Sequence, residues 1–241
     1  MKKLIILITL VAYASILKAQ DVADSRQLAI KWAPTGLILG SLSLQGEYNF
    51  GKNSLTAKIG LPVKVNHTFT YEDKDAEFQM RATSFLAGYR MYLSKKHMRG
   101  LYFEPFFKYV HQNAEGVGNG TLSGDPVVMD FTNDYNGLGI GAQLGVQFMI
   151  KKRFVIDLFL IGPEINSSRN NFKAVETSHS IPWTSIQAGE AEKDIRNFID
   201  KFPFIRDHVD VMVDKNNRTV ITDFKGALPG FRTGVSFGVA F

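Results

Sequence analysis

Histidine, serine and acidic side chains are the groups in this sequence that could carry acid–base or nucleophilic chemistry. None of the histidines has the HExxH spacing that places two metal ligands on one helical face. His111 ends a strand-like segment, but Tyr109 and Asn113 stand where a serine would have to lie on the same strand face. His179 stands beside Ser180, whose side chain would point to the opposite face. We therefore predict no catalytic residue and no metal site. The histidines considered are His67, His97, His111, His179 and His208.

Charged side chains that alternate with large apolar ones form a second set. Three are acids and five are bases. Burial of an unpaired charge is very costly, so the set predicts a mutually paired polar network inside the protein. An ion path is the alternative, although side chains normally fill a lumen of the size expected below. The predicted network consists of Lys31, Glu47, Lys58, Arg90, Glu104, Lys108, Asp157 and Arg232.

Eight strand-like segments must position these charges. In each segment the large apolar residues recur at every second position, which is the period of a β-strand. In "NGLGIGAQLGVQFMI", for example, Leu138 and Phe148 share one face, while Gly139 and Gln147 share the other. The opposite faces carry glycine, polar or charged residues. The segments are 28–33, 42–50, 55–63, 84–93, 101–111, 136–150, 154–162 and 231–241.

The connections between these segments alternate in length. Short ones follow the second, fourth and sixth segments, whereas residues 64–83, 113–136 and 163–228 form long ones. An even-stranded outer-membrane barrel has short periplasmic turns and long outer loops. Ten residues at about 3.3 Å each, tilted by about 40°, give the roughly 25 Å apolar band of such barrels. We predict an all-β fold, an eight-stranded antiparallel transmembrane β-barrel of the up-and-down type.

Aromatic residues mark both expected rims of this barrel. Trp32, Tyr109 and Phe231 fall at the outer rim of the strands. Phe50, Phe103, Phe154 and Phe241 fall at the periplasmic rim. This distribution is typical of interfacial aromatic girdles.

The N-terminal residues 1–19 have the order of a secretory signal peptide. Lys2 and Lys3 precede an apolar run from Leu4 to Leu17, and Ala19 follows as a small residue for cleavage. The run is shorter than the roughly 20 residues of a spanning helix, which disfavours the alternative of an uncleaved anchor. Without these residues the net charge falls from +5 to +2, so nucleic-acid binding is not expected. Residues 20–241 form one predicted barrel domain with a loop insertion at about 164–228.

The last long connection contains two further predicted elements. "AEKDIRNFIDKFPF" places apolar residues at helical spacing and stops at Pro203, which predicts a short amphipathic helix. The runs Val209–Val213 and Thr219–Phe224 flank the turn-forming "DKNN" and predict a β-hairpin. This outer loop is either a lid over the barrel mouth or a surface for a partner or ligand.

"SLSLQGEYNF", "LFLIGPEI" and "DFKGALPGFRTGVSFGVAF" resemble a family of small signal-bearing outer-membrane β-barrels of unknown function from Gram-negative bacteria. The likeness covers roughly residues 26–165 and 222–241. It implies a fold and a location in the outer membrane, and it carries no activity or catalytic residues. The C-terminal Phe237, Val239 and Phe241 also resemble the signal that barrel-assembly machinery reads.

Three functions follow as hypotheses. The first is a non-enzymatic integral outer-membrane protein with a packed polar lumen, whose extracellular loops serve surface interaction or envelope integrity. The second is an enzyme that modifies lipid A or phospholipid, and the third is a secreted lipocalin-like barrel that binds an apolar ligand. The expected partners are outer-membrane lipid, lipopolysaccharide and the barrel-assembly machinery, with no nucleic acid and no cofactor. The sequence does not identify a partner of the long loops.

Overall fold

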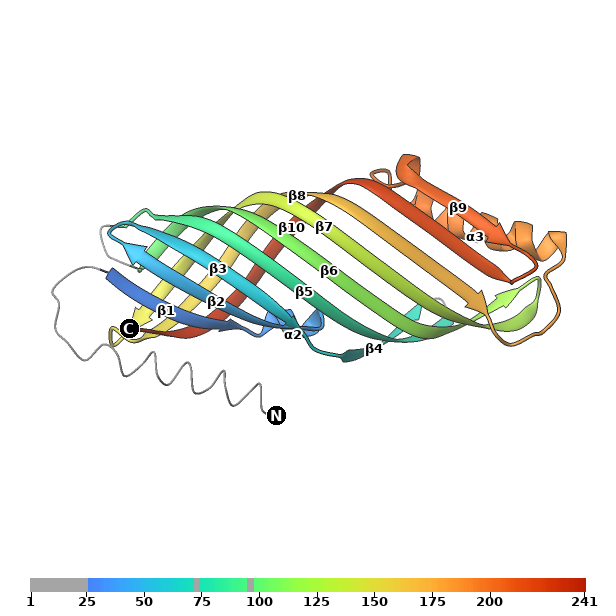
Figure 1. Ribbon diagram of the computed structural model, residues 1–241, viewed down its shortest axis with the longest axis horizontal. Coiled ribbons are helices and arrows are strands. Elements are labelled where there is room, and N and C mark those ends of the chain that lie inside the picture. The colour runs from blue at the N-terminus through green and yellow to red at the C-terminus, as the bar shows by residue number, and fades with distance from the viewer. Residues whose placement is uncertain (1–25, 72–73, 95–97) are drawn as a thin grey trace.

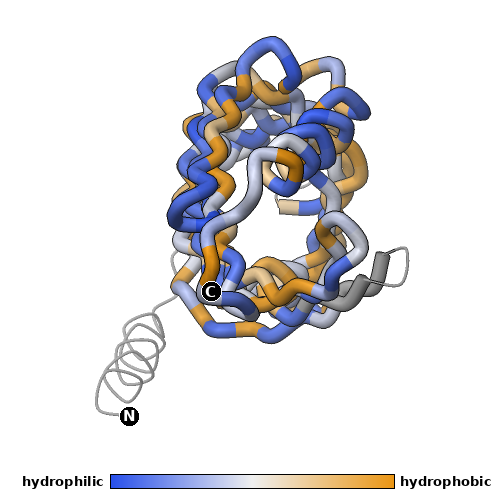
Figure 2. The backbone as a smooth tube through the Cα atoms, turned by 90° about the vertical axis from the view of Figure 1, so that its right-hand side faces the viewer, coloured by the Kyte–Doolittle hydropathy of each residue, from blue (hydrophilic) through white to orange (hydrophobic). Residues whose placement is uncertain are grey.

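A computed structural model describes residues 26–241, apart from residues 72–73 and 95–97. The predicted signal peptide at residues 1–19 lies outside the described residues. The fold is all-β: ten strands form one antiparallel sheet, and eight of them close into a ring in which β1 pairs with β10 (Figure 1). Viewed along the long axis, the backbone encircles a common centre (Figure 2).

The eight ring strands correspond to the eight predicted segments, and two further strands flank them. Among the described strands, β4 pairs with β5 alone and β9 pairs with β10 alone. The strands of the ring are β1 (Arg26–Ala33), β2 (Ser41–Phe50), β3 (Asn53–Pro62), β5 (Lys74–Tyr92), β6 (Gly100–Leu122), β7 (Asp125–Ile150), β8 (Phe154–Glu176) and β10 (Thr219–Ala240). The flanking strands are β4 (Val65–Tyr71) and β9 (Val209–Asp214).

The seam of the ring joins the two ends of the sheet. Trp32 on β1 pairs with Phe237 on β10. The backbone N–H of Phe241 donates to the carbonyl oxygen of Leu28 over 2.7 Å, and the Leu28 N–H donates back over 3.2 Å. Every ring strand therefore has a neighbour on both sides, which leaves the ring without an open edge.

The connections predicted at residues 64–83 and 113–136 are strand for most of their length, so this part of the prediction was wrong; the connection predicted at 163–228 is strand at both of its ends. Residues 74–83 belong to β5, residues 113–122 and 125–136 belong to β6 and β7, and residues 163–176 belong to β8. β6 and β7 meet in a two-residue turn, Ser123–Gly124, where both φ angles are positive, at 53° and 87°. This combination is characteristic of the tight type I′ hairpin turn, whose twist matches that of the strands.

Strands β5 to β8 and β10 thus continue well beyond the ends of β1, β2 and β3 (Figure 1). We call the part that contains all eight strands the ring region. The continuation of these five strands, with β4, β9 and residues 177–218, is the extension. The extension starts at one row of residues that pair with one another across neighbouring strands. This row consists of Thr83, His111, Asn136, Arg169 and Lys225.

In the ring region the outward faces are apolar, and the inward faces carry the charged side chains. Ile140 on β7 is 61% exposed and Phe107 on β6 is 41% exposed, whereas the inward-facing Arg90 and Gln147 are fully buried. A soluble strand has the reverse arrangement, with its apolar face in the core. The strands therefore expose a continuous apolar surface around a polar interior.

In the extension the two faces exchange character. The inward faces carry Phe78, Phe131 and Phe172. The ring centroid of Phe131 lies 6.4 Å from that of Phe78 and 6.1 Å from that of Phe172. Gly116 lies between Phe78 and Phe131 in the register, so no side chain separates the two rings. The outward positions Glu115 and Asn119 are exposed. The extension therefore has the arrangement of a water-soluble protein, with an apolar inner side.

Residues 177–218 form a compact insertion at the far end of the extension. α3 (Ser185–Asp200) starts earlier than the predicted helix and ends before Pro203. Thr184 caps it, because its hydroxyl accepts from the backbone N–H of Gln187 while Gln187 Oε1 accepts from the Thr184 N–H. A short turn of helix, η1 (Arg206–His208), leads to β9, which forms the predicted hairpin with β10.

α3 packs on the inner side of the extension. Trp183, Leu122, Val127 and Val220 form a buried cluster at the tip, against which the α3 residue Ile195 packs. Two mainly apolar cavities of about 260 and 330 Å³ lie on either side of Ile195. The helix therefore partly covers the apolar inner surface of the extension.

Candidate functional site

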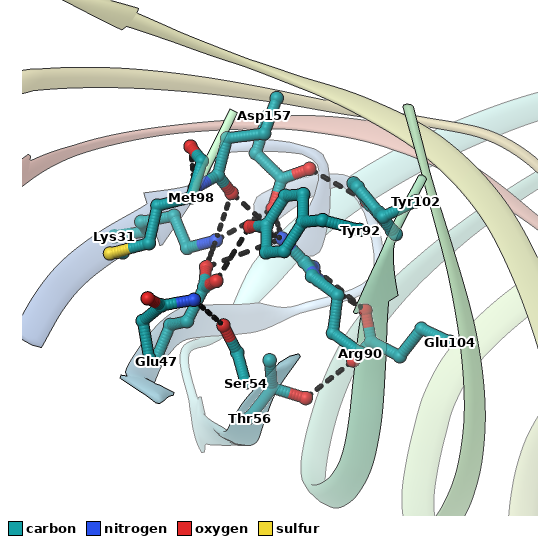
Figure 3. Close-up of polar contacts among 12 residues, drawn as sticks. Lys31, Glu47, Ser54, Thr56, Arg90, Tyr92, Met98, Tyr102, Glu104 and Asp157 are labelled. Atoms are coloured by element: carbon teal, nitrogen blue, oxygen red, sulfur yellow. Dashed lines mark hydrogen bonds and ion pairs between the residues drawn. The ribbon is translucent and has the colours of Figure 1, made fainter. Parts of the chain in front are cut away.

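Two bases and three acids meet at the centre of the ring region (Figure 3). Lys31 Nζ lies 2.6 Å from Glu47 Oε2 and 2.7 Å from Asp157 Oδ2. Arg90 Nη2 lies 2.7 Å from Glu104 Oε2, and its Nη1 lies 2.8 Å from Asp157 Oδ2 and 3.3 Å from Glu47 Oε2. All five side chains are fully buried. We call these five residues the central network.

Two tyrosines hold the acids of the central network in place. The hydroxyl of Tyr92 donates to Glu47 over 2.6 Å, and the hydroxyl of Tyr102 donates to Asp157 over 2.7 Å. The Tyr102 ring also lies 3.7 Å from the guanidinium carbon of Arg90, so it packs directly against the cation. Both tyrosines follow the inward parity of their strands and lie two residues from a charged member of the network.

Two glutamines from β7 complete the layer. Gln147 accepts hydrogen bonds from Lys31 over 2.8 Å and from Arg90 over 2.7 Å. Gln143 donates to Glu104 over 2.9 Å. The layer spans β1, β2, β5, β6, β7 and β8, so its hydrogen bonds cross the ring rather than follow one strand pair. Such a buried polar layer fixes the relative register of the strands that contribute to it.

A separate ion pair lies nearer the extension. Lys108 on β6 contacts Glu164 on β8, and their side chains are 20% and 6% exposed. Glu164 was assigned to a connection in the sequence analysis, because the strand was expected to end before Pro163. A bulge explains why β8 continues: Leu160 and Ile161 both point outward, so the inward parity shifts and includes Glu164.

Lys58 and Arg232 differ from the expectation of a mutually paired set. Among the described residues, no acid lies within ion-pair distance of either cation. Both instead contact Phe159: Lys58 Nζ lies 5.5 Å, and the Arg232 guanidinium carbon 5.2 Å, from the ring centroid. Arg232 also packs on Phe106 at 5.3 Å.

A cavity of about 370 Å³ begins where these two cations lie, beneath α2 (Thr35–Ile38), which joins β1 to β2. Lys58, Lys108 and Arg232 line its inner part. Ile38, Leu39 and Phe85 line its outer part and remain exposed. The cavity therefore joins a positively charged interior to an apolar surface.

The structure thus divides the eight charged residues of the sequence prediction into three groups. Five form the central network, Lys108 pairs with Glu164, and Lys58 and Arg232 face the cavity. The sequence analysis did not select Glu164, nor the tyrosines and glutamines of the central layer. Strand parity was the signal that could have selected Tyr92 and Tyr102, because each shares the face of Arg90 or Glu104.

The histidines do not form a catalytic arrangement in the described part of the chain. His179 Nδ1 lies 3.0 Å from Glu176 Oε1 and 3.2 Å from the Ser178 hydroxyl. A serine–histidine–acid relay uses both ring nitrogens, one for the acid and one for the serine, whereas a single nitrogen makes both contacts here. His111 contacts Asn136 over 2.8 Å on the outer surface.

The side chain of Glu176 instead links the two ends of the insertion. Its carboxylate accepts from the Ser178 hydroxyl and the backbone N–H of His179, and it lies 3.3 Å from Arg218 Nε at the other end of the insertion. Burial raises the pKa of Glu176, but the hydrogen bonds from Ser178 and His179 lower this pKa by a larger amount. The pKa of Glu176 therefore lies below the ordinary value of 4.5.

No group of three or more potential metal ligands occurs among the described residues. Over the same part of the chain, no helix is long and apolar enough to cross a bilayer. Comparison with protein-family models, with curated proteins and with solved structures finds no match for this chain.

Proposed function

We propose that this chain is a non-enzymatic integral outer-membrane β-barrel protein that holds a surface extension above the membrane. The observation that carries the proposal is the exchange of faces along the strands. The ring region has apolar residues outside and charged residues inside, and the extension has the reverse. Exposed residues such as Ile140 and Phe148 match a lipid environment, and exposed residues such as Glu115 match water.

The height of the apolar surface supports a bilayer. On β10 it runs from Phe231 to Phe241, and ten residues at a tilt of about 40° span roughly 25 Å. Trp32 and Tyr109 lie near its outer limit, as interfacial aromatics do. A closed ring also satisfies every strand edge, which hydrocarbon requires.

The central network gives the barrel a sealed interior. Its side chains are fully buried and hydrogen-bonded across the lumen, which supports a lumen that is filled at this layer. The network fills the lumen and holds the strands in register, and the barrel does not conduct ions. This role favours a structural or binding function over transport.

The remaining parts of the proposal concern the cell envelope. The barrel belongs with the small Gram-negative outer-membrane barrels that its sequence resembles, and it is exported by its N-terminal signal peptide. Phe237, Val239 and Phe241 form the signal for the barrel-assembly machinery. Lipid and lipopolysaccharide surround the ring region, and the extension faces the cell exterior, where it serves surface interaction or envelope integrity.

A secreted lipocalin-like barrel would need an apolar interior in the ring region, where the chain has its charged network. A lipid-modifying enzyme would need a nucleophile with a base on the outward face. His111 has Asn136 as its nearest partner and no serine contact. Neither alternative has a supporting observation of comparable weight.

Fractionation of a Gram-negative host that expresses the full chain tests the proposal. The protein should enter the outer-membrane fraction and migrate as a compact band that shifts on boiling. Protease added to whole cells should cut first between residues 177 and 208, outside the paired strands. Recovery as a soluble periplasmic protein would refute the membrane location, and cleavage only at the turn between β5 and β6 would reverse the orientation.

A further inference from the structure

The charges inside the ring region are unevenly distributed along its axis. The central network has two cations and three carboxylates, so its formal charge is −1. Next to it, toward the extension, lie Lys58, Lys108 and Arg232 with the single acid Glu164, so this upper group has a formal charge of +2. Even if Glu164 served both Lys108 and Arg232, positive charge would remain in excess. The three cations are partly buried, and an excess of charge on partly buried side chains favours a bound counterion.

Unused hydrogen-bond donors lie in the same place. Nη1 of Arg232 is buried and has no hydrogen-bond partner, and the same holds for the hydroxyl of Ser41. Both residues line the cavity beneath α2, together with Lys58. Buried donors are almost always paired, so these two donors and the Lys58 ammonium group around one cavity favour a ligand that supplies hydrogen-bond acceptors.

A glycine in the cavity wall leaves room for polar side chains. Gly60 on β3 pairs with Ser43 on β2 and with Ser84 on β5. A Cβ atom at Gly60 would collide with the hydroxyls of Ser84 and of Ser41, which lies two residues before Ser43 on β2. Glycine at this position therefore lets the two hydroxyls approach each other beside Lys58. Cations with hydroxyl donors match the oxygen atoms of a tetrahedral oxyanion.

We propose that the cavity beneath α2 is a binding site for a phosphate group, held by Lys58, Arg232 and Ser41. Arg232 supplies a fork of N–H donors, Lys58 supplies a mobile ammonium group, and Ser41 supplies a hydroxyl. The proposal concerns binding of the phosphate and includes no covalent step. The inference rests on the cavity and does not depend on the membrane location.

The phosphate can be free or can belong to a lipid. The cavity volume of about 370 Å³ exceeds that needed for a phosphate group alone, and its outer part is formed by exposed Ile38, Leu39 and Phe85. An acyl or glycerol part of a phospholipid could therefore lie against these residues while its phosphate contacts the cations. Both sources share the same phosphate chemistry, and the experiment separates them.

Isothermal titration of the folded full chain in a zwitterionic detergent tests the proposal with two probes. The first probe is inorganic phosphate, and the second is phosphatidic acid in mixed micelles, with phosphatidylcholine micelles as background. Lys58→Met and Arg232→Met should each weaken binding by about tenfold or more, and Ser41→Ala by a smaller factor. Lys64→Met, which removes an exposed lysine outside the cavity, should leave binding unchanged.

Saturable binding of inorganic phosphate that the cavity variants lose supports a site for the free ion. Binding of phosphatidic acid alone, with the same loss, supports the site for a lipid-borne phosphate. Absence of binding to both probes overturns the proposal, as does binding that Lys58→Met and Arg232→Met leave unchanged. Heat-shifted migration of each variant on gels verifies that the barrel is folded, so a folding defect is not mistaken for loss of the site.

Discussion

Arg90 contacts Glu47, Glu104 and Asp157 from a position with no exposure to solvent. Each of these carboxylates also receives at least one neutral or cationic donor from another strand. The side chains were recognisable from the sequence as inward-facing, because strand parity identifies the face. Which of these side chains pair with one another could not be recognised from the sequence, because the pairing depends on the stagger between strands that lie far apart in the sequence.

Arg90→Met should destabilise the ring of strands by about 3–5 kcal/mol, because among the described residues it leaves Glu47 and Asp157 with Lys31 as their ion-pair partner and Glu104 with none. Urea unfolding in detergent, followed by circular dichroism, measures the change. Arg81→Met, an exposed arginine on the same strand, should have little effect. The double variant Arg90→Met with Glu104→Gln should recover part of the loss; a double variant as unstable as the sum of the two changes would argue against a shared network.

Glu176 gives the base of the insertion a dependence on pH. Its pKa is lowered in the folded protein, so its stabilising contribution is present above pH 4.5 and is lost as the pH falls through the lower, folded-state value. Glu176→Gln should reduce hydrogen-exchange protection of β9 by about fivefold at pH 6, on the order of 1 kcal/mol. The difference between the two proteins should disappear toward pH 3. A difference that persists there would contradict the assignment to the ionised carboxylate.

Among the secondary-structure elements, the long hairpin of β6 and β7 marks the limit of the sequence analysis. The alternation of large apolar residues predicted both strands as far as His111 and Asn136. Beyond that row the apolar residues move to the inner face, and Gly116 and Gly120 interrupt the pattern. Glycine has low strand propensity, so the segment resembled a loop. Pairing with β5 and β8 fixes it as strand instead.

The part of α3 from Ala191 onward was predicted, because its apolar residues recur at helical spacing. The first turns of α3 and the capping box of Thr184 and Gln187 were not predicted. Thr184→Ala should destabilise the helix by about 1 kcal/mol. Limited proteolysis should then cut residues 185–200 several times faster, with the heat-shifted barrel band unchanged. Thr121→Ala, an exposed threonine at the tip of β6, provides the control. Equal cleavage rates in the wild type, Thr184→Ala and Thr121→Ala would mean that tertiary contacts alone stabilise the helix.

For the whole molecule, the exchange of faces predicts two environments along a single hairpin. Ile140 in the ring region and Val117 in the extension both point outward and are 61% and 45% exposed. Ile140→Arg places a charge in the apolar band and should cost about 2–4 kcal/mol of folding into lipid vesicles. Val117→Arg should fold as the wild type does. Equal effects of the two substitutions on the folded fraction would mean that the two surfaces face the same solvent.

The two tryptophans of the chain lie one in each part, and they allow the most direct test of the membrane location. Trp32 is 40% exposed on the outward face of β1, whereas Trp183, in the insertion, is 5% exposed. The variants Trp183→Phe and Trp32→Phe each leave one fluorophore. In vesicles of brominated lipid, the emission of Trp32 should be strongly quenched and that of Trp183 should not. Unquenched Trp32 in the folded protein, or equal quenching of both, would contradict the account.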